Sequence, residues 1–268
     1  MRGAALVATG RKACTEVPWH QSGDSAALPA DDPRGWEVVA PSPIKFSDVY
    51  PQPRELTVPE IQAITQKFAE AAVRADRAGF DVLEVHGAHG YLISEFLSPT
   101  ANKRTDSYGG SFENRTRFLY ETVRAVRAAW PDHKPLFVRL SCEEWVEDGW
   151  HIKDTVAVAR ELKAMGVDLL DCSSGGINSK QKIAVGPGYQ VPFADAVRRE
   201  ASIPTGAVGL ITEPQQAEDI LQADKADLIL LARPLLREPR WAYRAAYELG
   251  ADIQWAPQAE RAKLRPKL

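Results

Sequence analysis

The sequence predicts an α/β protein built around a parallel sheet. Short runs rich in valine, leucine and isoleucine alternate with segments whose apolar residues recur at helical spacing. The runs are almost continuously apolar, which is typical of strands that are buried on both faces. Strands of this kind, separated by amphipathic helices, indicate a sheet that is covered by helices on both sides or closed into a barrel.

The composition is that of an ordinary globular protein. The 268 residues are 44% hydrophobic and 26% charged, which is enough apolar material for one core. The 33 basic and 36 acidic side chains leave a net charge of −3, so neither nucleic acid nor an anionic membrane is favoured as a partner. No apolar run is long enough to span a bilayer. We expect a single domain over residues 1–268.

Cysteine usage and the chain start both point to the cytoplasm. Cys14, Cys142 and Cys172 are too dispersed for a disulfide framework. The first residues hold a short apolar stretch that runs directly into Gly10, Arg11 and Lys12, which makes a poor signal peptide. We therefore expect a reducing, cytoplasmic environment.

The first element is an apolar run at residues 4–9, which we predict to be a strand. A proline-rich segment follows at residues 18–56, with prolines at 18, 29, 33, 41, 43, 51 and 53. So many prolines forbid a regular helix or a central strand. We predict a long loop, and loops of this length are often functional.

A helix is predicted to begin directly after Thr57. Thr57 can cap the helix, Glu60 can return the capping-box hydrogen bond, and Pro59 is tolerated in the first turn. Gly79 occupies the position after a helix that favours glycine. The apolar run at residues 81–85 is the next predicted strand.

The same alternation continues to the C-terminus. We predict helices at 113–130, 154–165, 193–200, 214–222 and 240–249, and strands at 135–140, 167–171, 204–208 and 227–231. This makes six strands and six helices, whereas a TIM (β/α)8-type barrel has eight of each in ~250 residues. The fold expected is an incomplete TIM-type barrel of about six βα units, or a six-unit sheet. Any two further units of a barrel are expected before Met1.

Two imidazoles and a phenol follow the strand at 81–85. His86, Gly87, Ala88, His89, Gly90 and Tyr91 stand where a barrel strand would deliver them to the site end. Two neutral histidines can donate hydrogen bonds to one carbonyl or nitro oxygen, and a phenol can supply a proton nearby. The alternative interpretations are that His86 and His89 have a structural role or form half of a metal site. For the latter, the scattered His20, His133 and His151 offer no evident partners.

Polar residues at other strand ends predict a phosphate-bearing ligand. Arg139 interrupts an apolar strand, where it needs an anion, an electron-rich ring edge, a carboxylate or solvent. Gly209 and the pair Ala232 and Arg233 follow the last two strands. Loops after the last two strands of such barrels often bind phosphate through backbone N–H groups, and arginine can grip phosphate bidentately.

Taken together, these residues resemble the Old Yellow Enzyme family of FMN-dependent ene reductases, in its bacterial NADPH dehydrogenase and xenobiotic reductase branch. The most specific segment is NKRTDSYGGSFENR at residues 102–115. Further support comes from GRKA at 10–13, HGAHGYL at 86–92 and DCSSG at 171–175. The resemblance extends over nearly the whole chain.

The resemblance implies FMN as cofactor and NADPH as hydride donor. It implies that His86 and His89, with Gly87 and Ala88 between them, hold the substrate oxygen, and that Tyr91 donates a proton. It further implies that Arg139 lies against the flavin pyrimidine, that Gly209, Ala232 and Arg233 bind the flavin phosphate, and that Arg11 and Lys12 lie near the rim. Arg261 resembles an arginine that reaches a neighbouring subunit in a homo-oligomer, although Ala259 replaces the family tyrosine beside it.

Three departures from the family pattern weaken that picture. The family has two βα units before the strand seen first here, a glutamine where Ala5 stands, and a histidine where Ala8 stands. An incomplete barrel would expose two sheet edges and lose part of the flavin surroundings. We therefore expect weak FMN binding and self-association. A non-catalytic remnant of the family is the alternative function, and a flavin-free lyase or isomerase using the histidine pair is a weaker third.

Overall fold

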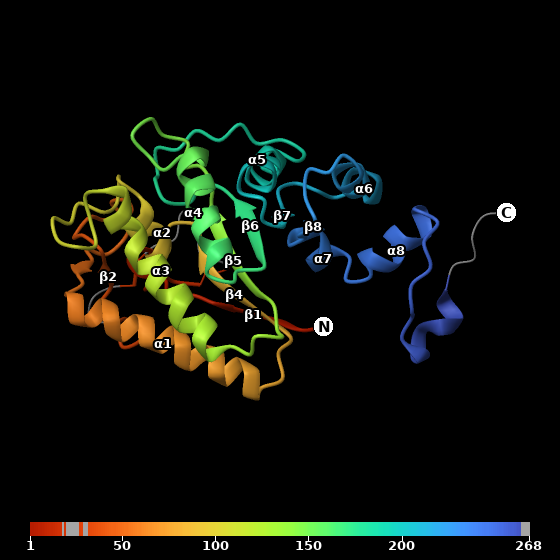
Figure 1. Ribbon diagram of the computed structural model, residues 1–268, viewed down its shortest axis with the longest axis horizontal. Helices are drawn as coiled ribbons and strands as arrows, with labels where there is room; N and C mark the ends of the chain where they lie inside the picture. The colour runs from red at the N-terminus through yellow and green to blue at the C-terminus, as the bar shows by residue number, and fades with distance from the viewer. Residues whose placement is uncertain (18, 20–26, 29–31, 264–268) are drawn as a thin grey trace.

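The structure is a computed structural model that describes residues 1–17, 19, 27–28 and 32–263. Its main sheet has six parallel strands in the order β1-β4-β5-β6-β7-β8 (Figure 1). They are Gly3–Leu6, Val82–Gly87, Leu136–Ser141, Leu169–Ser173, Thr205–Ala207 and Leu228–Ile229. Each strand pairs with the next one along the chain in that order. The predicted parallel α/β sheet of six strands is confirmed.

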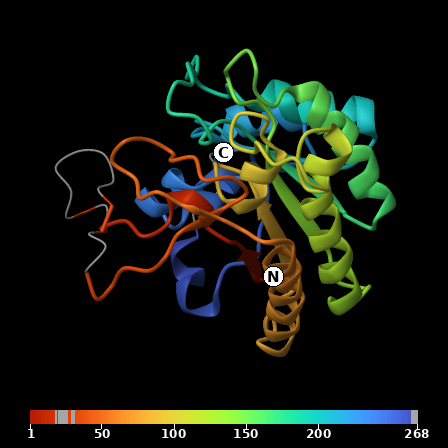
Figure 2. The same cartoon turned by 90° about the vertical axis from the view of Figure 1, so that its left-hand side faces the viewer.

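Helices lie between successive strands of the sheet, except the last two of them, which follow the last strand. They are α1 (Val58–Arg77), α2 (Leu92–Leu97), α3 (Phe112–Ala129), α4 (Ile152–Ala164), α5 (Val191–Ala201), α6 (Pro214–Gln222), α7 (Arg233–Arg237) and α8 (Trp241–Glu248). When neighbouring strands follow one another in the chain, right-handed crossovers carry their helices to the same face. Figure 2 shows α3, α4 and α5 on one side of the sheet and the described part of the proline-rich segment on the other. The winding is therefore that of a partial barrel rather than of a sheet covered on both sides.

The core lies between the sheet and this helix layer. On β4, Leu83 and Val85 are completely buried against α1 and α3, together with Val138 of β5. Because side chains alternate across a strand, Glu84 and His86 point to the opposite, inner face. The apolar face holds the sheet together, and the inner face is left free for polar groups.

Several element boundaries differ from the predicted ones. The capping box at Thr57 and Glu60 is present, and α6 has the predicted bounds. Strand β4 ends two residues later than predicted, because the backbone pairing continues through His86 and Gly87. The short helices α2 and α7 and the 3-10 turns η1 (Gly10–Lys12) and η3 (Pro257–Ala262) were not predicted.

The described residues of the proline-rich segment are irregular as predicted, apart from a bridge between Ala27 and Thr15 and one short strand pair. Val39–Ala40 (β2) and Arg54–Glu55 (β3) form a two-residue parallel pair. Pro18, Pro29 and His20 lie outside the described residues. Within the part of the chain that the structure describes, no helix is long and apolar enough to cross a membrane.

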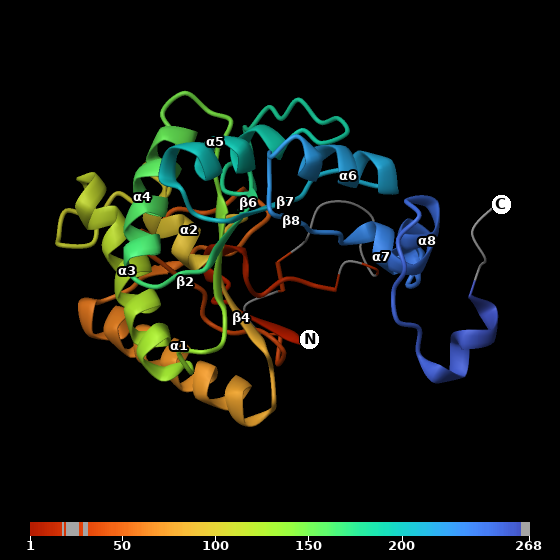
Figure 3. The ribbon, with the colours of Figure 1, turned by 45° about the vertical axis from the view of Figure 1, so that its right-hand side comes forward.

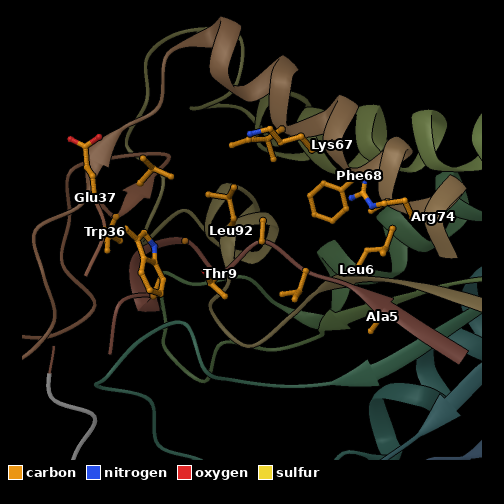
Figure 4. Close-up of a pocket in the computed structure, with 17 residues that line it drawn as sticks. Ala5, Leu6, Thr9, Trp36, Glu37, Lys67, Phe68, Arg74 and Leu92 are labelled. Atoms are coloured by element: carbon orange, nitrogen blue, oxygen red, sulfur yellow. The ribbon is translucent and has the colours of Figure 1, made fainter. Parts of the chain in front are cut away.

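The described sheet is open at both ends. Strand β1 pairs only with β4, and β8 only with β7. The free side of β1 opens onto a cavity of about 560 Å³ beneath α1, lined by Ala5, Leu6, Phe68 and Leu92 among others (Figure 4). At the other end, α8 and the following segment stand apart from β1 (Figure 3).

Candidate functional site

Strand register assembles a polar row across the inner face of the sheet. His86 of β4 lies opposite Arg139 of β5, Arg139 opposite Asp171 of β6, and Asp171 opposite Gly206 of β7. Because the strands are parallel, their carboxyl ends and the loops that follow meet at one edge. The site residues predicted on β4 and β5 are therefore neighbours in space.

Arg139 and Asp171 form a buried ion pair within this row. Arg139 Nε lies 3.0 Å from Asp171 Oδ2, in a geometry that does not make a hydrogen bond. Burial raises the pKa of Asp171 to about 7, and the positive charge of Arg139 opposes that rise. Of the environments considered for Arg139, the structure provides a carboxylate. The guanidinium is a quarter exposed and also borders the cavity described below.

The two histidines and the tyrosine are brought together as predicted. The ring centroid of His86 lies 5.1 Å from that of His89 and 5.5 Å from that of Tyr91. His86 Nε2 is buried and has no hydrogen-bond partner among the described residues. Its ring is therefore available for a bound oxygen. Tyr91 stands at the N-terminus of α2.

His89 is held in an unusual backbone conformation. Its φ is 62°, a left-handed value that non-glycine residues seldom adopt. Its backbone N–H donates to Ser141 Oγ at 2.8 Å, and its ring Nε2 lies 2.7 Å from Ser173 Oγ. The next residue, Gly90, packs so closely on Gly176 that a Cβ there would overlap the Gly176 carbonyl. The turn is thus fixed between the ends of β5 and β6.

Both imidazoles are kept neutral. Burial lowers the pKa of His86 to about 4, and the positive charge of Arg139 contributes. Burial also lowers the pKa of His89 to about 3, with Arg139, His86 and Lys12 adding smaller effects. A neutral imidazole has one N–H donor and one acceptor nitrogen. At neutral pH the pair is therefore suited to hydrogen bonding rather than to carrying positive charge.

A cavity of about 260 Å³ extends from His89 to the loops after the last two strands, and neither His86 nor Tyr91 lines it. Its lining includes His89 and Arg139, together with the three residues predicted to bind phosphate: Gly209, Ala232 and Arg233. The lining also holds Arg237 and contains no carboxylate side chain. Arg233 and Arg237, together with Arg139, whose carboxylate partner Asp171 lies outside the lining, make a cavity suited to an anion.

The cavity has a close backbone wall at Gly209. Its φ is 125°, and a Cβ at this position would lie 3.0 Å from Gln190 Nε2 and from the ring of Tyr189. Gln190 is held in turn, since its Oε1 accepts from Ser174 Oγ at 2.7 Å and its Nε2 donates to the Val208 carbonyl. Glycine at 209 therefore leaves space for a ligand next to the backbone.

Lys12 reaches the site from the η1 turn. Its Nζ donates to the carbonyls of His89 and Gly176 at 2.9 and 3.0 Å. It also lies 5.5 Å from the ring centroid of Tyr91. Lys12 is thus beside the histidine pair and the phenol, as the family resemblance implied for the rim.

The remaining predicted residues are placed differently. Gly87 is the last residue of β4 and Ala88 is buried in the turn, and neither lines the cavity. Arg261 is exposed in η3 and does not line it either. The described residues contain no group of three histidine, cysteine or acidic side chains that could hold a metal ion.

Sequence reasoning missed Ser173, Gln190 and Arg237. Ser173 directly follows the apolar residues of β6, as His86 follows those of β4, so its position could have been noticed. Gln190 lies at the end of a long loop and Arg237 in a five-residue helix. Neither has a local pattern that would distinguish it from a surface residue.

Comparison with known proteins identifies the family. Residues 3–252 match the family described as "NADH:flavin oxidoreductase / NADH oxidase family". The chain is 54% identical over 225 residues to the NADPH dehydrogenase of Geobacillus sp. (strain WCH70), covering 84% of this chain and 65% of that protein. It is 47% identical over 248 residues to the NADPH dehydrogenase of Bacillus pumilus (strain SAFR-032), covering 92% and 71%.

Comparison with solved structures supports the same family assignment. Morphinone reductase superposes with a TM-score of 0.68 at 28% identity, over 84% of this chain and 63% of that one. A 2-naphthoyl-CoA reductase complex superposes with a TM-score of 0.77 at 26% identity, over 92% and 37%. The chain spans about two thirds of the length of the curated relatives that it matches, 65% in the Geobacillus case. The resemblance to Old Yellow Enzyme is thereby confirmed, and the chain belongs to the NADH:flavin oxidoreductase / NADH oxidase family.

Proposed function

We propose that this protein is an FMN-dependent NADPH oxidoreductase that reduces activated carbon–carbon double bonds in α,β-unsaturated carbonyl or nitro compounds. The observation that carries the proposal is the joining of two features. His86 and His89 form a pair of neutral histidines at the end of β4, and His89 also lines a cavity that has three arginines and no carboxylate side chain in its lining. The similarity to proteins named NADPH dehydrogenase supports the choice of reaction.

In this proposal the histidines polarise the substrate. The free, buried Nε2 of His86 donates to the carbonyl or nitro oxygen, and the adjacent His89 ring assists. A neutral donor stabilises negative charge that develops on that oxygen without itself losing a proton. The Ser173 contact orients the His89 ring for this task.

Tyr91 is proposed as the proton donor to the α-carbon. Its ring centroid lies 5.5 Å from that of the His86 ring. The ammonium of Lys12 lies 5.5 Å from the centroid of the Tyr91 ring and so adds positive charge beside the phenol. General acid catalysis of this kind needs only that the phenol reach the substrate carbon.

The arginine-lined cavity fits the phosphate of FMN. Arg233 and Arg237 supply charge, Gly209 and Ala232 supply close backbone, and Arg139 reaches in from β5. When bound, FMN supplies the hydride chemistry that amino-acid side chains lack. The β1 side fits the ring system less well, since Ala5 and Ala8 offer it no side-chain donor.

Small-molecule substrates and a cytoplasmic location belong to the same proposal. All three cysteines are free and buried, which suits a reducing compartment. A neutral-to-acidic surface charge does not favour a nucleic-acid partner.

The second candidate is a member of the family that binds an anion and does not catalyse. The β1 side of the site favours it, because Ala5 and Ala8 offer no side-chain donor to a flavin ring. In that case phosphate or FMN binds weakly through the arginines, and NADPH is not oxidised.

A flavin titration and a turnover assay separate the two candidates. The purified chain is titrated with FMN, and NADPH oxidation is then followed at saturating FMN with and without an enone. We expect weak but saturable FMN binding and NADPH oxidation that the enone accelerates. A chain that binds FMN without any enone-dependent oxidation would support the second candidate. A chain that binds neither FMN nor inorganic phosphate, titrated in the same way, would contradict both.

A further inference from the structure

A buried carboxyl group lies directly beneath the turn that carries Lys12. Glu95 is in α2, one helical turn beyond Tyr91, and its side chain is completely inaccessible to solvent. Its Oε1 accepts a hydrogen bond from the backbone N–H of Arg11 at 2.7 Å. Its Oε2 is buried without a hydrogen-bond partner among the described residues. The proposed reaction does not use this group, so the burial of a carboxyl group here needs another explanation.

The turn folds over the carboxyl in a way that only glycine permits. Gly10 has a φ of 62°, and a Cβ there would overlap the Glu95 carboxyl group. The turn and the carboxyl are therefore in van der Waals contact over Gly10 and bonded at Arg11. A side chain at position 10 would therefore displace the Glu95 carboxyl group, and a shift of that carboxyl group would displace the turn.

Side chains of the same turn donate hydrogen bonds to the loops that follow β4 and β6. Arg11 Nη2 donates to the Ile177 carbonyl at 2.7 Å, in the loop after β6. Lys12 Nζ joins the His89 carbonyl after β4 to the Gly176 carbonyl after β6. The turn thus connects β1 to both loops that flank the histidine pair, and Glu95 supports it from below.

Burial and the neighbouring positive charges have opposite effects on the pKa of the Glu95 carboxyl group. Burial raises the pKa of Glu95 to about 8, and the charges of Arg11 and Lys12 together with the Arg11 N–H bond oppose the rise. Burial of a carboxyl costs free energy even when the group is neutral. A leucine would fill the space without that cost, but it could not accept the Arg11 hydrogen bond.

We propose that Glu95 is a positioning residue: its carboxyl anchors the Gly10–Lys12 turn, and the turn sets the Lys12 ammonium beside Tyr91 and His89. The kinetic consequence of this inference rests on the proposed function. The placement of Lys12 does not, because it can be measured without flavin.

The placement is tested with Glu95→Gln, Glu95→Asp and Glu95→Leu. Gln keeps an acceptor at the same reach, Asp keeps the carboxyl but is too short, and Leu keeps only the volume. The readout is the rate of reductive methylation of Lys12, measured by peptide mass spectrometry relative to the exposed Lys153 of the same sample. Melting temperature and circular dichroism check that each variant is folded.

We expect Glu95→Gln to leave Lys12 protected, and Glu95→Asp and Glu95→Leu to raise its methylation rate about tenfold or more, as for loss of one strong hydrogen bond. Glu121→Gln is the matched control, because the Glu121 carboxylate accepts a hydrogen bond from the Tyr108 hydroxyl and not from the turn. Its Lys12 rate should match that of the unaltered protein. If the Leu variant does not fold, the Lys12 methylation rate of the Asp variant decides whether the Glu95 carboxyl anchors the turn.

Two results would overturn the inference. One is unchanged Lys12 methylation in the folded Asp and Leu variants. The other is equal behaviour of the Gln and Leu variants, which would mean that Glu95 only fills space. Turnover gives the kinetic half: with FMN and an enone, Asp and Leu should lower kcat while the rate of NADPH oxidation without enone stays near that of the unaltered protein. If the unaltered protein itself shows no turnover, the proposed function fails, and the methylation result still decides the role of Glu95.

Discussion

The centre of the sheet and its C-terminal end are built very differently. Strands β4, β5 and β6 have five or six residues each, and their apolar face is buried. Strands β7 and β8 have only three and two residues, and α7 buries no residue. The histidine pair stands on the first region, whereas Gly209, Ala232 and Arg233 stand on the second. Polarising groups that must be placed accurately lie on the more buried framework.

This difference has a physical consequence for ligand binding. Segments with few buried apolar contacts open at low free energy, and a ligand that binds them contributes to their order. We infer that the anion-binding end depends on its ligand for order, while the histidine end is preorganised. Each prediction below tests one side of this comparison.

The largest effect is expected at Tyr91. Tyr91→Phe keeps the ring and removes the proton, so turnover of an enone that needs α-protonation should fall ~10²–10⁴-fold. Nitroalkenes should be affected less, because their reduced nitronate can be protonated by water. Steady-state kinetics with both substrate types measure the difference. Equal losses would indicate a structural role for Tyr91 instead.

The stability contrast between the two regions comes next. Phe118 of α3 is 0% exposed, and Leu236 of α7 is 83% exposed. Phe118→Ala should lower the free energy of unfolding by about 3–5 kcal/mol, whereas Leu236→Ala should change it by less than about 0.5 kcal/mol. Urea unfolding followed by circular dichroism gives both values. A similar loss in the two variants would contradict the described contrast in packing.

His86→Ala tests the preorganised side. Loss of one donor to developing charge costs about 2.7–4 kcal/mol of transition-state stabilisation. We expect kcat/KM for the enone to fall accordingly, and phenol binding to weaken. NADPH oxidation without enone should change much less. Enone reduction at the parent rate would contradict the role of His86.

Arg233→Ala tests the loosely packed side. Loss of a charge-assisted hydrogen bond costs about 1.5–3 kcal/mol, so FMN affinity should fall roughly tenfold to a hundredfold. Arg240→Ala is the control, because Arg240 is exposed nearby and does not line the cavity. Hydrogen exchange in α7 should slow when FMN is added, with little change in β4. Slowing of equal size in both elements would remove the distinction drawn above.

The smallest effect concerns the protonation of the histidines. With pKa values of about 4 and 3, His86 and His89 should stay neutral from pH 8 to about pH 5. His151, whose pKa is raised mainly by the Glu147 carbonyl, should take up its proton first as the pH falls. Nitrogen-15 NMR of the imidazoles reports the order. A His86 ring that titrates near 6.5 would show that the pair is not desolvated.

The sign of the linkage follows from these shifts. Between pH 6.5 and about 4 the unfolded chain binds protons at His86 and His89 that the folded chain does not, so their contribution to stability falls as the pH falls. Asp171 acts in the opposite direction, since its pKa of about 7 makes the folded chain bind a proton that the unfolded chain releases. The free energy of unfolding of the Asp171→Asn variant should therefore fall more steeply with decreasing pH than that of the unaltered protein.

Local patterns determined much of the framework. The capping box at Thr57 and Glu60 and the bounds of α6 follow from interactions within one or two turns of chain, and sequence contains all of that information. The same holds for His86, His89 and Tyr91, which are close in space because they are close in the chain. The family motif at residues 102–115 then identified the cofactor that the resemblance implies.

Only the tertiary structure decided which distant residues meet. The pairing of Arg139 with Asp171 depends on the register of two strands separated by a helix. The approach of Glu95 to Arg11 joins positions 84 residues apart, and the cavity at Gly209 joins loops from different strands. Hydrophobic periodicity determines which face of an element is buried, but not which partner it meets. That choice results from packing the whole chain, so the polar row and the support beneath Lys12 became visible only in the folded structure.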